Sequence, residues 1–417
     1  MNVYPPFKDK LKILSEEQIC NVLISFDNLS NRENFIRKYN HLEFLGMIDF
    51  IPSILVNLKK EQIKNYENEQ LIKNIEENQN VCLAMLDVNS ILELNKYKTT
   101  EIAYTGKNVK VGIIDDGIDG KFPALSNVSL KKYKIYEKEK FLKEKGESQF
   151  THGTVMASVI SNRFRDGNSN YIGIAPNVSI YDFDISNPSE EYSIYDILNV
   201  FDKIFKEEID LDIVFISLTT KNSSDGNDLL SLACDMLSEK KIIVVCPAGN
   251  SGPNSYTIGS PGAAKKVITI GSLNKEFKIS SFSGRGPTLD ERKKPDICFP
   301  GTDINVPITN DLRLKVSGTS VATAIGVGVI ALIKEYDPNI SHEALIDMLS
   351  KSKIDLDYDI NTQGLGTVKV SSLFKNLDLF HEKLVPYSYL IKKSLRLSVE
   401  FLILFVFLFY LFYFFRI

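Results

Sequence analysis

Five largely apolar runs, separated by segments long enough to form helices, constrain the fold of this 417-residue chain more than any other feature. They occupy residues 109–114, 179–185, 213–218, 242–246 and 267–270. Apolar runs without polar alternation are typical of strands covered on both faces, as in parallel sheets flanked by helices. Helices are predicted at 192–208, 227–240, 320–336 and 341–351. The sequence therefore predicts an α/β fold built on a doubly wound, mostly parallel sheet, within a large domain spanning residues 107–375.

A smaller unit is predicted over residues 19–90, after an N-terminal extension, 1–18. Its expected strands are 22–26, a pair within 44–58 broken at Pro52, and 81–88, and its expected helices are 31–39 and 61–78. The resulting order, β-α-β-β-α-β, is that of a small ferredoxin-like α+β domain. A polar linker, 91–106, would join this unit to the large domain.

The segment 397–415 predicts a transmembrane helix, joined to the large domain by a connector, 376–396. Its 19 residues are rich in Phe, Leu and Tyr; they would extend about 28 Å as a helix, close to the ~30 Å of a hydrocarbon core. Lys392, Lys393 and Arg396 precede it, so the charge bias places the large domain in the cytoplasm. No apolar signal-peptide region follows the first 13 residues. The alternative is a short amphipathic or self-associating helix.

Composition excludes several functional classes. A net charge of −4 gives no reason to expect a nucleic-acid partner. Five cysteines lie scattered without metal-ligand spacing and are expected to be buried free thiols: Cys20, Cys82, Cys234, Cys246 and Cys298. No cofactor motif is evident and no Asp-rich calcium loop is recognisable. A structural calcium ion bound through backbone carbonyls stays open.

Two acids end the first apolar run of the large domain. A carboxylate at the carboxyl end of a parallel strand lies at the edge where α/β active sites form. Asp115 is the candidate because the alternation of the strand continues inward to it, and Asp116 is the rival.

A histidine base is found by elimination among four histidines. His41 lies in the small unit, His342 at a polar helix start and His381 in the connector. His152 alone lies among small residues with an apolar helix behind it, which makes it the candidate general base.

The other two candidates are a serine that begins a helix and an asparagine that follows a strand. Gly318-Thr319-Ser320 places a serine at the start of an apolar helix, whose free N–H groups and partial positive charge favour a developing oxyanion. Asn250 follows the run 242–246 between glycines, where it is either an oxyanion donor or an ordinary turn residue.

The order Asp115, His152, Asn250, Ser320, together with Gly-Thr-Ser-x-Ala, resembles the subtilisin-like (subtilase) serine peptidases. The resemblance covers about residues 106–373 and includes the blocks 173–176, 281–287, 294–297 and 300–304. It implies Ser320 as nucleophile, His152 as base, Asp115 as the acid that orients the imidazole, and Asn250 as oxyanion donor. It also implies that the small N-terminal unit is an inhibitory pro-domain, with a processing site in the linker.

One segment departs from the family pattern. The substrate-binding strand often ends Ser-Leu-Gly-Gly, whereas here it reads Ser217-Leu218-Thr219-Thr220, and two β-branched threonines should narrow that wall. Ala248, Gly249 and Ser251 are the other predicted substrate-binding residues. Because Ser251 carries no charge, no charged floor is expected in the primary pocket. Asp182 and Asp184 could favour basic substrates or be solvated acids at the rim.

These observations predict a serine endopeptidase made as an autoprocessed pro-form and held at a membrane, with peptides or proteins, its own pro-domain and the membrane as partners. The narrowed cleft suggests a selective maturation or leader peptidase. The alternative is a catalytically impaired binding or scaffold protein with the subtilase fold.

Overall fold

The computed structural model describes residues 2–78, 80–82, 92, 104–135, 151–164, 173–187, 192–307 and 313–374. The chain divides into one unit from Met1 to Val370 and another from Ser371 onward. The predicted connector and the segment 397–415 lie outside the described residues, as does most of the predicted linker.

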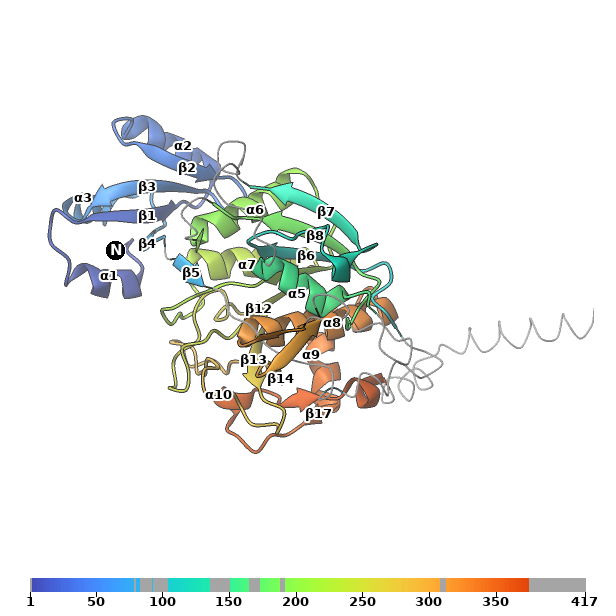
Figure 1. Ribbon diagram of the computed structural model, residues 1–417. Coiled ribbons are helices and arrows are strands. Elements are labelled where there is room, and N and C mark those ends of the chain that lie inside the picture. The colour runs from blue at the N-terminus through green and yellow to red at the C-terminus, as the bar shows by residue number, and fades with distance from the viewer. Residues whose placement is uncertain are drawn as a thin grey trace, which may run out of the picture. The chain divides into compact units, whose positions relative to one another are not determined.

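A seven-stranded sheet forms the centre of the large domain, and every neighbouring pair of its strands is parallel. The order is β14-β13-β12-β10-β6-β8-β7, and all of these strands except β10 are labelled in Figure 1. The strands are β6 (Lys110–Asp115), β7 (Ser129–Lys134), β8 (Ser179–Asp184), β10 (Ile213–Ile216), β12 (Ile243–Pro247), β13 (Ile268–Leu273) and β14 (Ile297–Pro300). The predicted α/β fold with a large parallel sheet is thus confirmed.

Helices cover both faces of this sheet, which explains why its strands read as continuous apolar runs. On one face, Val214, Ile216, Val244 and Cys246 share a core with residues of α6 (Ile194–Lys206) and α7 (Leu229–Glu239). The helices α5 (His152–Ser161) and α8 (Thr319–Tyr336) pack against each other and against strands β6, β12 and β13. Smaller elements complete the large domain: η1 (Pro123–Leu125), the hairpin β15 (Ile304–Pro307) and β16 (Arg313–Val316), α9 (His342–Lys351), α10 (Ile360–Gln363), and the pair β17 (Lys353–Ile354) and β18 (Thr367–Val368).

Strand β7 was not predicted because its sequence, Ser-Leu-Lys-Lys-Tyr-Lys, carries lysines where a buried strand would be apolar. It lies at the edge of the sheet, where such residues remain in contact with water.

The small unit folds as predicted in its order but not in all its boundaries. An antiparallel sheet, β2-β3-β1-β4, is formed by β1 (Ile19–Ser25), β2 (Phe44–Ile48), β3 (Ser53–Lys59) and β4 (Asn74–Glu77), with α2 (Leu29–Lys38) and α3 (Lys60–Tyr66). Helix α1 (Pro5–Leu11) also contributes to its core through Phe7 and Leu11.

The prediction of a helix over 61–78 was wrong beyond Tyr66. Ile75 pairs with Ile24 of β1 and is fully buried, so strand pairing and burial override the helical propensity of the Glu- and Lys-rich sequence. The sheet is therefore closed by β4 and not by the predicted strand 81–88. Strand β5 (Asn80–Cys82) pairs instead with β9 (Tyr192–Ser193) and β11 (Thr219–Thr220) of the large domain.

Within the described residues, one helix, α8, is long and apolar enough to cross a membrane. Its most apolar window is 89% buried inside the protein, and it contacts four strands of the central sheet. It is accordingly a core helix.

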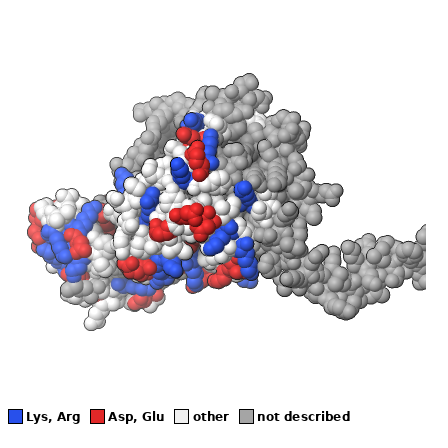
Figure 2. Space-filling model, turned by 90° about the horizontal axis from the view of Figure 1, so that it is seen from below, with Lys and Arg blue, Asp and Glu red and all other residues white. Residues whose placement is uncertain are grey.

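Acidic and basic side chains are intermingled on the face seen in Figure 2. Two of the surface ion pairs join Lys203 to Glu207 and Lys266 to Glu239. This mixture agrees with the small net charge of the sequence.

Candidate active site

The structure brings together the three residues predicted to form a catalytic triad. Asp115 ends strand β6 and is fully buried, His152 is the first residue of helix α5, and Ser320 is the second residue of helix α8. The Nδ1 atom of His152 lies 2.7 and 3.0 Å from the two carboxylate oxygens of Asp115. Its Nε2 atom lies 3.1 Å from Ser320 Oγ. One hydrogen-bonded chain therefore runs from carboxylate to imidazole to hydroxyl.

The environment of Asp115 favours its charged form. Burial acts to raise the pKa of this carboxyl group, but the neighbouring charge of His152 and its hydrogen bond outweigh that effect, so the pKa is lowered. A carboxylate in this state holds Nδ1 as the protonated nitrogen and leaves Nε2 to accept a proton.

Asp116, the rival candidate, has a different place. Its two carboxylate oxygens accept hydrogen bonds from the backbone N–H groups of His152, at 3.1 Å, and Gly153, at 2.8 Å. Burial and the charge of Asp115 raise the pKa of Asp116 to about 7. Asp116 thus holds the start of helix α5, while Asp115 contacts the imidazole ring.

Asn250 lies beside the start of helix α8, as an oxyanion donor requires. Its Oδ1 atom accepts hydrogen bonds from both the backbone N–H and the Oγ1 hydroxyl of Thr319, each at 3.0 Å. The amide Nδ2 is thereby left to donate toward a substrate near Ser320. Sequence reasoning missed the role of Thr319 in orienting this amide; its place between Gly318 and the serine was the available signal.

The predicted substrate-binding residues lie on two facing segments. Ser217, Leu218, Thr219 and Ala248 are buried. The facing segment also includes Gly249, with φ of +91°, and Ser251, which is exposed. Ser217 Oγ donates to the carbonyl oxygen of Ile114, 2.9 Å away and next to Asp115 in the chain.

An extended segment of the small unit already lies along this wall. Strand β5 pairs antiparallel with β11, where residue 82 is opposite Thr219, and with β9, where residue 80 is opposite Ser193. The three strands form a small sheet of their own. The chain therefore places an extended segment of its own, β5, against the predicted substrate-binding strand.

Asp182 and Asp184 are not solvated rim acids, because they are only 1% and 8% exposed on strand β8. Asp182 accepts a hydrogen bond from the backbone N–H of Ile118, and burial raises the pKa of its carboxyl group to about 7. Neither expected role, a solvated acid or an exposed site for basic substrates, fits their burial. In the parts of the chain that the structure describes, no three or more His, Cys, Asp or Glu side chains are grouped to hold a metal ion.

Comparisons with known proteins agree with this site. Residues 106–372 match the subtilase family, Peptidase S8. Serine protease AprX of Bacillus subtilis is 29% identical over 305 residues, which cover 64% of this chain and 66%, just under two thirds, of AprX. Subtilisin DY of Bacillus licheniformis is 30% identical over 275 residues, which cover 64% of this chain and 92% of that protein.

A solved structure shares the fold. The epidermin leader peptide processing serine protease (EpiP) of Staphylococcus aureus aligns with a TM-score of 0.63 at 19% identity, covering 86% of this chain and 98% of EpiP. Because the family match extends over more than half of the sequence, the chain belongs to the subtilase family of subtilisin-like serine peptidases.

Proposed function

We propose that the chain is a serine endopeptidase in which Ser320 is the nucleophile, His152 the general base, Asp115 the orienting acid and Asn250 the oxyanion donor. The observation that carries the proposal is the hydrogen-bonded chain from Asp115 through His152 to Ser320. A triad of this kind is recognised by its geometry and the roles of its members.

In the proposed reaction, Ser320 Oγ attacks the carbonyl carbon of the scissile peptide bond as its proton passes to His152 Nε2. The imidazolium that forms is stabilised by Asp115. The oxyanion of the tetrahedral intermediate accepts hydrogen bonds from Asn250 Nδ2 and the backbone N–H of Ser320. The C–N bond then breaks, and His152 gives its proton to the leaving amine. Water, activated by the same imidazole, hydrolyses the acyl-enzyme and regenerates the Ser320 hydroxyl.

We propose further that the small unit inhibits this site as a pro-domain. It hydrogen-bonds to the amino ends of two helices of the large domain. Glu76 Oε1 accepts from the backbone N–H of Leu229 in α7, at 2.7 Å, and Asn78 Oδ1 accepts from Tyr195 in α6, at 3.0 Å. In return, Asp202 Oδ1 accepts from two backbone N–H groups of the small unit, at residues 49 and 50.

Close packing supports the same interface. The Tyr195 hydroxyl lies 1.8 Å from the position that a Cβ atom on Gly46 would take, so any side chain there would collide with the ring. The docked unit places strand β5 against β11. Another peptide can therefore reach β11 only after the small unit has been cut and has dissociated.

Autoprocessing is the experiment that tests the proposed function. Residue 82 is paired with Thr219. In a substrate that kept this register, the residue two positions later would be opposite Ser217, next to the triad. That residue is Ala84, so we expect the bond after Ala84 to be cut, earlier in the chain than the linker at 91–106. Edman or mass-spectrometric sequencing of purified wild-type protein should find Met85 at the new N-terminus. A full-length protein that shows no cleavage at any concentration would favour the non-catalytic scaffold alternative.

The stability of the pro-form is expected to depend on pH through Glu76. Burial and the nearby charges of Asp228 and Asp225 raise the pKa of Glu76 well above its usual value despite its bond to the Leu229 N–H. An acid whose folded pKa is raised binds its proton more tightly in the folded state, so stability falls as pH rises from about 4.5 toward that pKa. The neighbouring titratable groups are Asp228, Asp225 and Tyr4, whose hydroxyl donates to Asp225.

Glu76→Gln keeps an acceptor for the Leu229 N–H and removes the charge. In a Ser320→Ala background, which prevents processing, the thermal midpoint of Glu76→Gln should exceed that of the parent by an amount that grows as the pH rises above about 4.5. Glu77→Gln is the control, because Glu77 pairs at the surface with Lys10. Equal pH dependence in the parent and Glu76→Gln would contradict this interpretation.

We also propose that the segment 397–415 anchors the protein in a membrane, with the peptidase domain on the cytoplasmic side, as the charge bias of the sequence suggests. The full chain should co-sediment with lipid vesicles and resist alkaline carbonate extraction, whereas a chain ending at residue 395 should stay in solution. Extraction of the full chain by carbonate would instead support a helix lying on the membrane surface.

A selective role, such as the removal of a leader or pro-segment from a peptide substrate, is the last part of the proposal. It is supported by Thr219 and Thr220 of β11, which stand where the family often has two glycines. Both threonines are buried.

A further inference from the structure

The side chain of Thr219 lies where strand β11 faces the segment that carries Asn250. Its methyl carbon, Cγ2, is 3.3 Å from the position that a Cβ atom on Gly249 would take, and its Oγ1 atom is 3.9 Å from the same position. The residue is 7% exposed. The methyl group therefore lies in the space between strand β11 and the segment that carries Gly249.

A hydrogen bond fixes the direction of this methyl group. Thr219 Oγ1 donates to the carbonyl oxygen of Ser260, 3.1 Å away. Because a threonine is stiff about χ1, fixing its hydroxyl also fixes its methyl. Ser260 is itself held, since its N–H donates to Thr220 Oγ1 at 2.8 Å and its hydroxyl donates to Asp228 at 2.6 Å.

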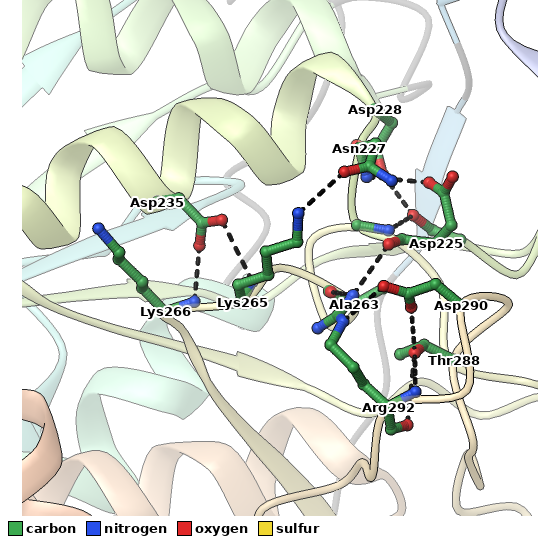
Figure 3. Close-up of polar contacts among 12 residues, drawn as sticks. Asp225, Asn227, Asp228, Asp235, Ala263, Lys265, Lys266, Thr288, Asp290 and Arg292 are labelled. Carbon is green, nitrogen blue, oxygen red and sulfur yellow. Dashed lines mark hydrogen bonds and ion pairs between the residues drawn. The ribbon is translucent and has the colours of Figure 1, made fainter.

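The segment that follows Ser260 is anchored as well (Figure 3). Arg292 Nη2 donates to the carbonyl oxygens of Ala263, at 2.6 Å, and Asp225, at 2.9 Å. Asp235 accepts from the backbone N–H of Lys266, at 2.7 Å. The carbonyl oxygen of Ser260, which accepts from Thr219, thus belongs to a loop held by several hydrogen bonds. The Thr219 methyl group is correspondingly fixed in position.

The same space is where a substrate side chain would enter. A peptide paired with β11 in the register of β5 runs from Thr219 toward Ser217 and the triad. The residue that donates the acyl group must direct its carbonyl oxygen to Asn250 and the Ser320 N–H. Its side chain is then brought beside Gly249, the residue before Asn250, and meets the Thr219 methyl.

We propose that the Thr219 methyl closes the primary substrate pocket, so that this peptidase cleaves after glycine, alanine or serine and rejects large side chains. The inference rests on the proposed function and names its substrate class. It agrees with Ala84 as the residue before the predicted processing bond.

The test compares kcat/KM for the processed protein on peptide substrates that differ only in having Ala, Leu or Phe before the scissile bond. Wild type should prefer Ala to Phe. Thr219→Gly should narrow or reverse this preference, raising cleavage after Phe relative to Ala by about 10-fold to 200-fold, the range expected for small changes in an apolar pocket. Thr219→Ser, which keeps the hydroxyl and removes the methyl, should shift the ratio in the same direction by less.

Thr219→Val is the matched control, because it keeps a branched side chain of the same size without the hydrogen bond to Ser260; its Ala-to-Phe ratio should stay close to wild type. The ratio does not depend on how much of each variant folds. Wild type that cleaves after Phe as readily as after Ala, or a ratio unchanged in Thr219→Gly, would overturn the inference. Titration with a fluorophosphonate separates this failure from that of the proposed function, since a protein with no reactive serine would be neither labelled nor active on any substrate.

Discussion

Replacement of Ser320 by alanine should reduce peptide hydrolysis by about 10⁶-fold in kcat, the loss known for the nucleophile of subtilisin. The side chain that attacks the carbonyl is then missing, and His152 Nε2, 3.1 Å from the hydroxyl, loses its partner. The same substitution should leave the chain unprocessed, since the proposed cut in the pro-segment uses the same site. Hydrolysis of a peptide substrate and the apparent mass of the purified protein measure both effects.

Ser317→Ala is the control for this substitution. Ser317 is exposed and lies three residues before the nucleophile, so its loss should change neither activity nor processing. Residual hydrolysis by Ser320→Ala within 10-fold of wild type would mean that another group performs the chemistry.

Replacement of Asn250 by alanine should lower kcat by about 10²–10³-fold with little change in KM, a magnitude taken from the oxyanion-hole asparagine of subtilisin. The amide donates to charge that develops only in the transition state, so substrate binding is spared. Asn250 is exposed, so its replacement should leave folding intact; the thermal midpoint of the variant checks this. Steady-state kinetics on one peptide substrate measure the two parameters.

Thr319→Val refines this prediction. It removes one of the two hydrogen bonds to Asn250 Oδ1 and leaves the one from the backbone N–H, at 3.0 Å. The amide should be less well oriented, and kcat should fall by less than in Asn250→Ala. An equal kcat in wild type and Asn250→Ala would remove Asn250 from the proposed mechanism.

The sequence predicted the parts of the site that lie at the ends of strands and helices. Asp115, His152, Asn250 and Ser320 all follow or begin an apolar run, and parallel strands bring such ends to one edge. It favoured Asp115 over Asp116 by strand alternation alone, without the partners that separate them. The two are neighbours whose side chains point to different partners, an imidazole ring and two backbone N–H groups.

Contacts between segments distant in the sequence account for the other differences between the predicted and the observed structure. The stretch after Tyr66 has the composition of a helix, but Ile75 pairs with β1 and fills the core of the small unit. Asp182 is polar within an apolar strand, and its burial follows from the position of β8 between two other strands. Glu76 reaches a helix 153 residues away. No local pattern records these contacts.

The central claim is that Ser320 is an activated nucleophile, and covalent labelling tests it most directly. Wild-type protein treated with a fluorophosphonate should gain one adduct, which tandem mass spectrometry should locate on Ser320 in the peptide that contains Gly318 and Thr319. The His152→Ala variant should lose most of this reaction, because the hydroxyl is inert without its base. Processed wild-type protein that forms no adduct, or forms it on a different residue, would contradict the account.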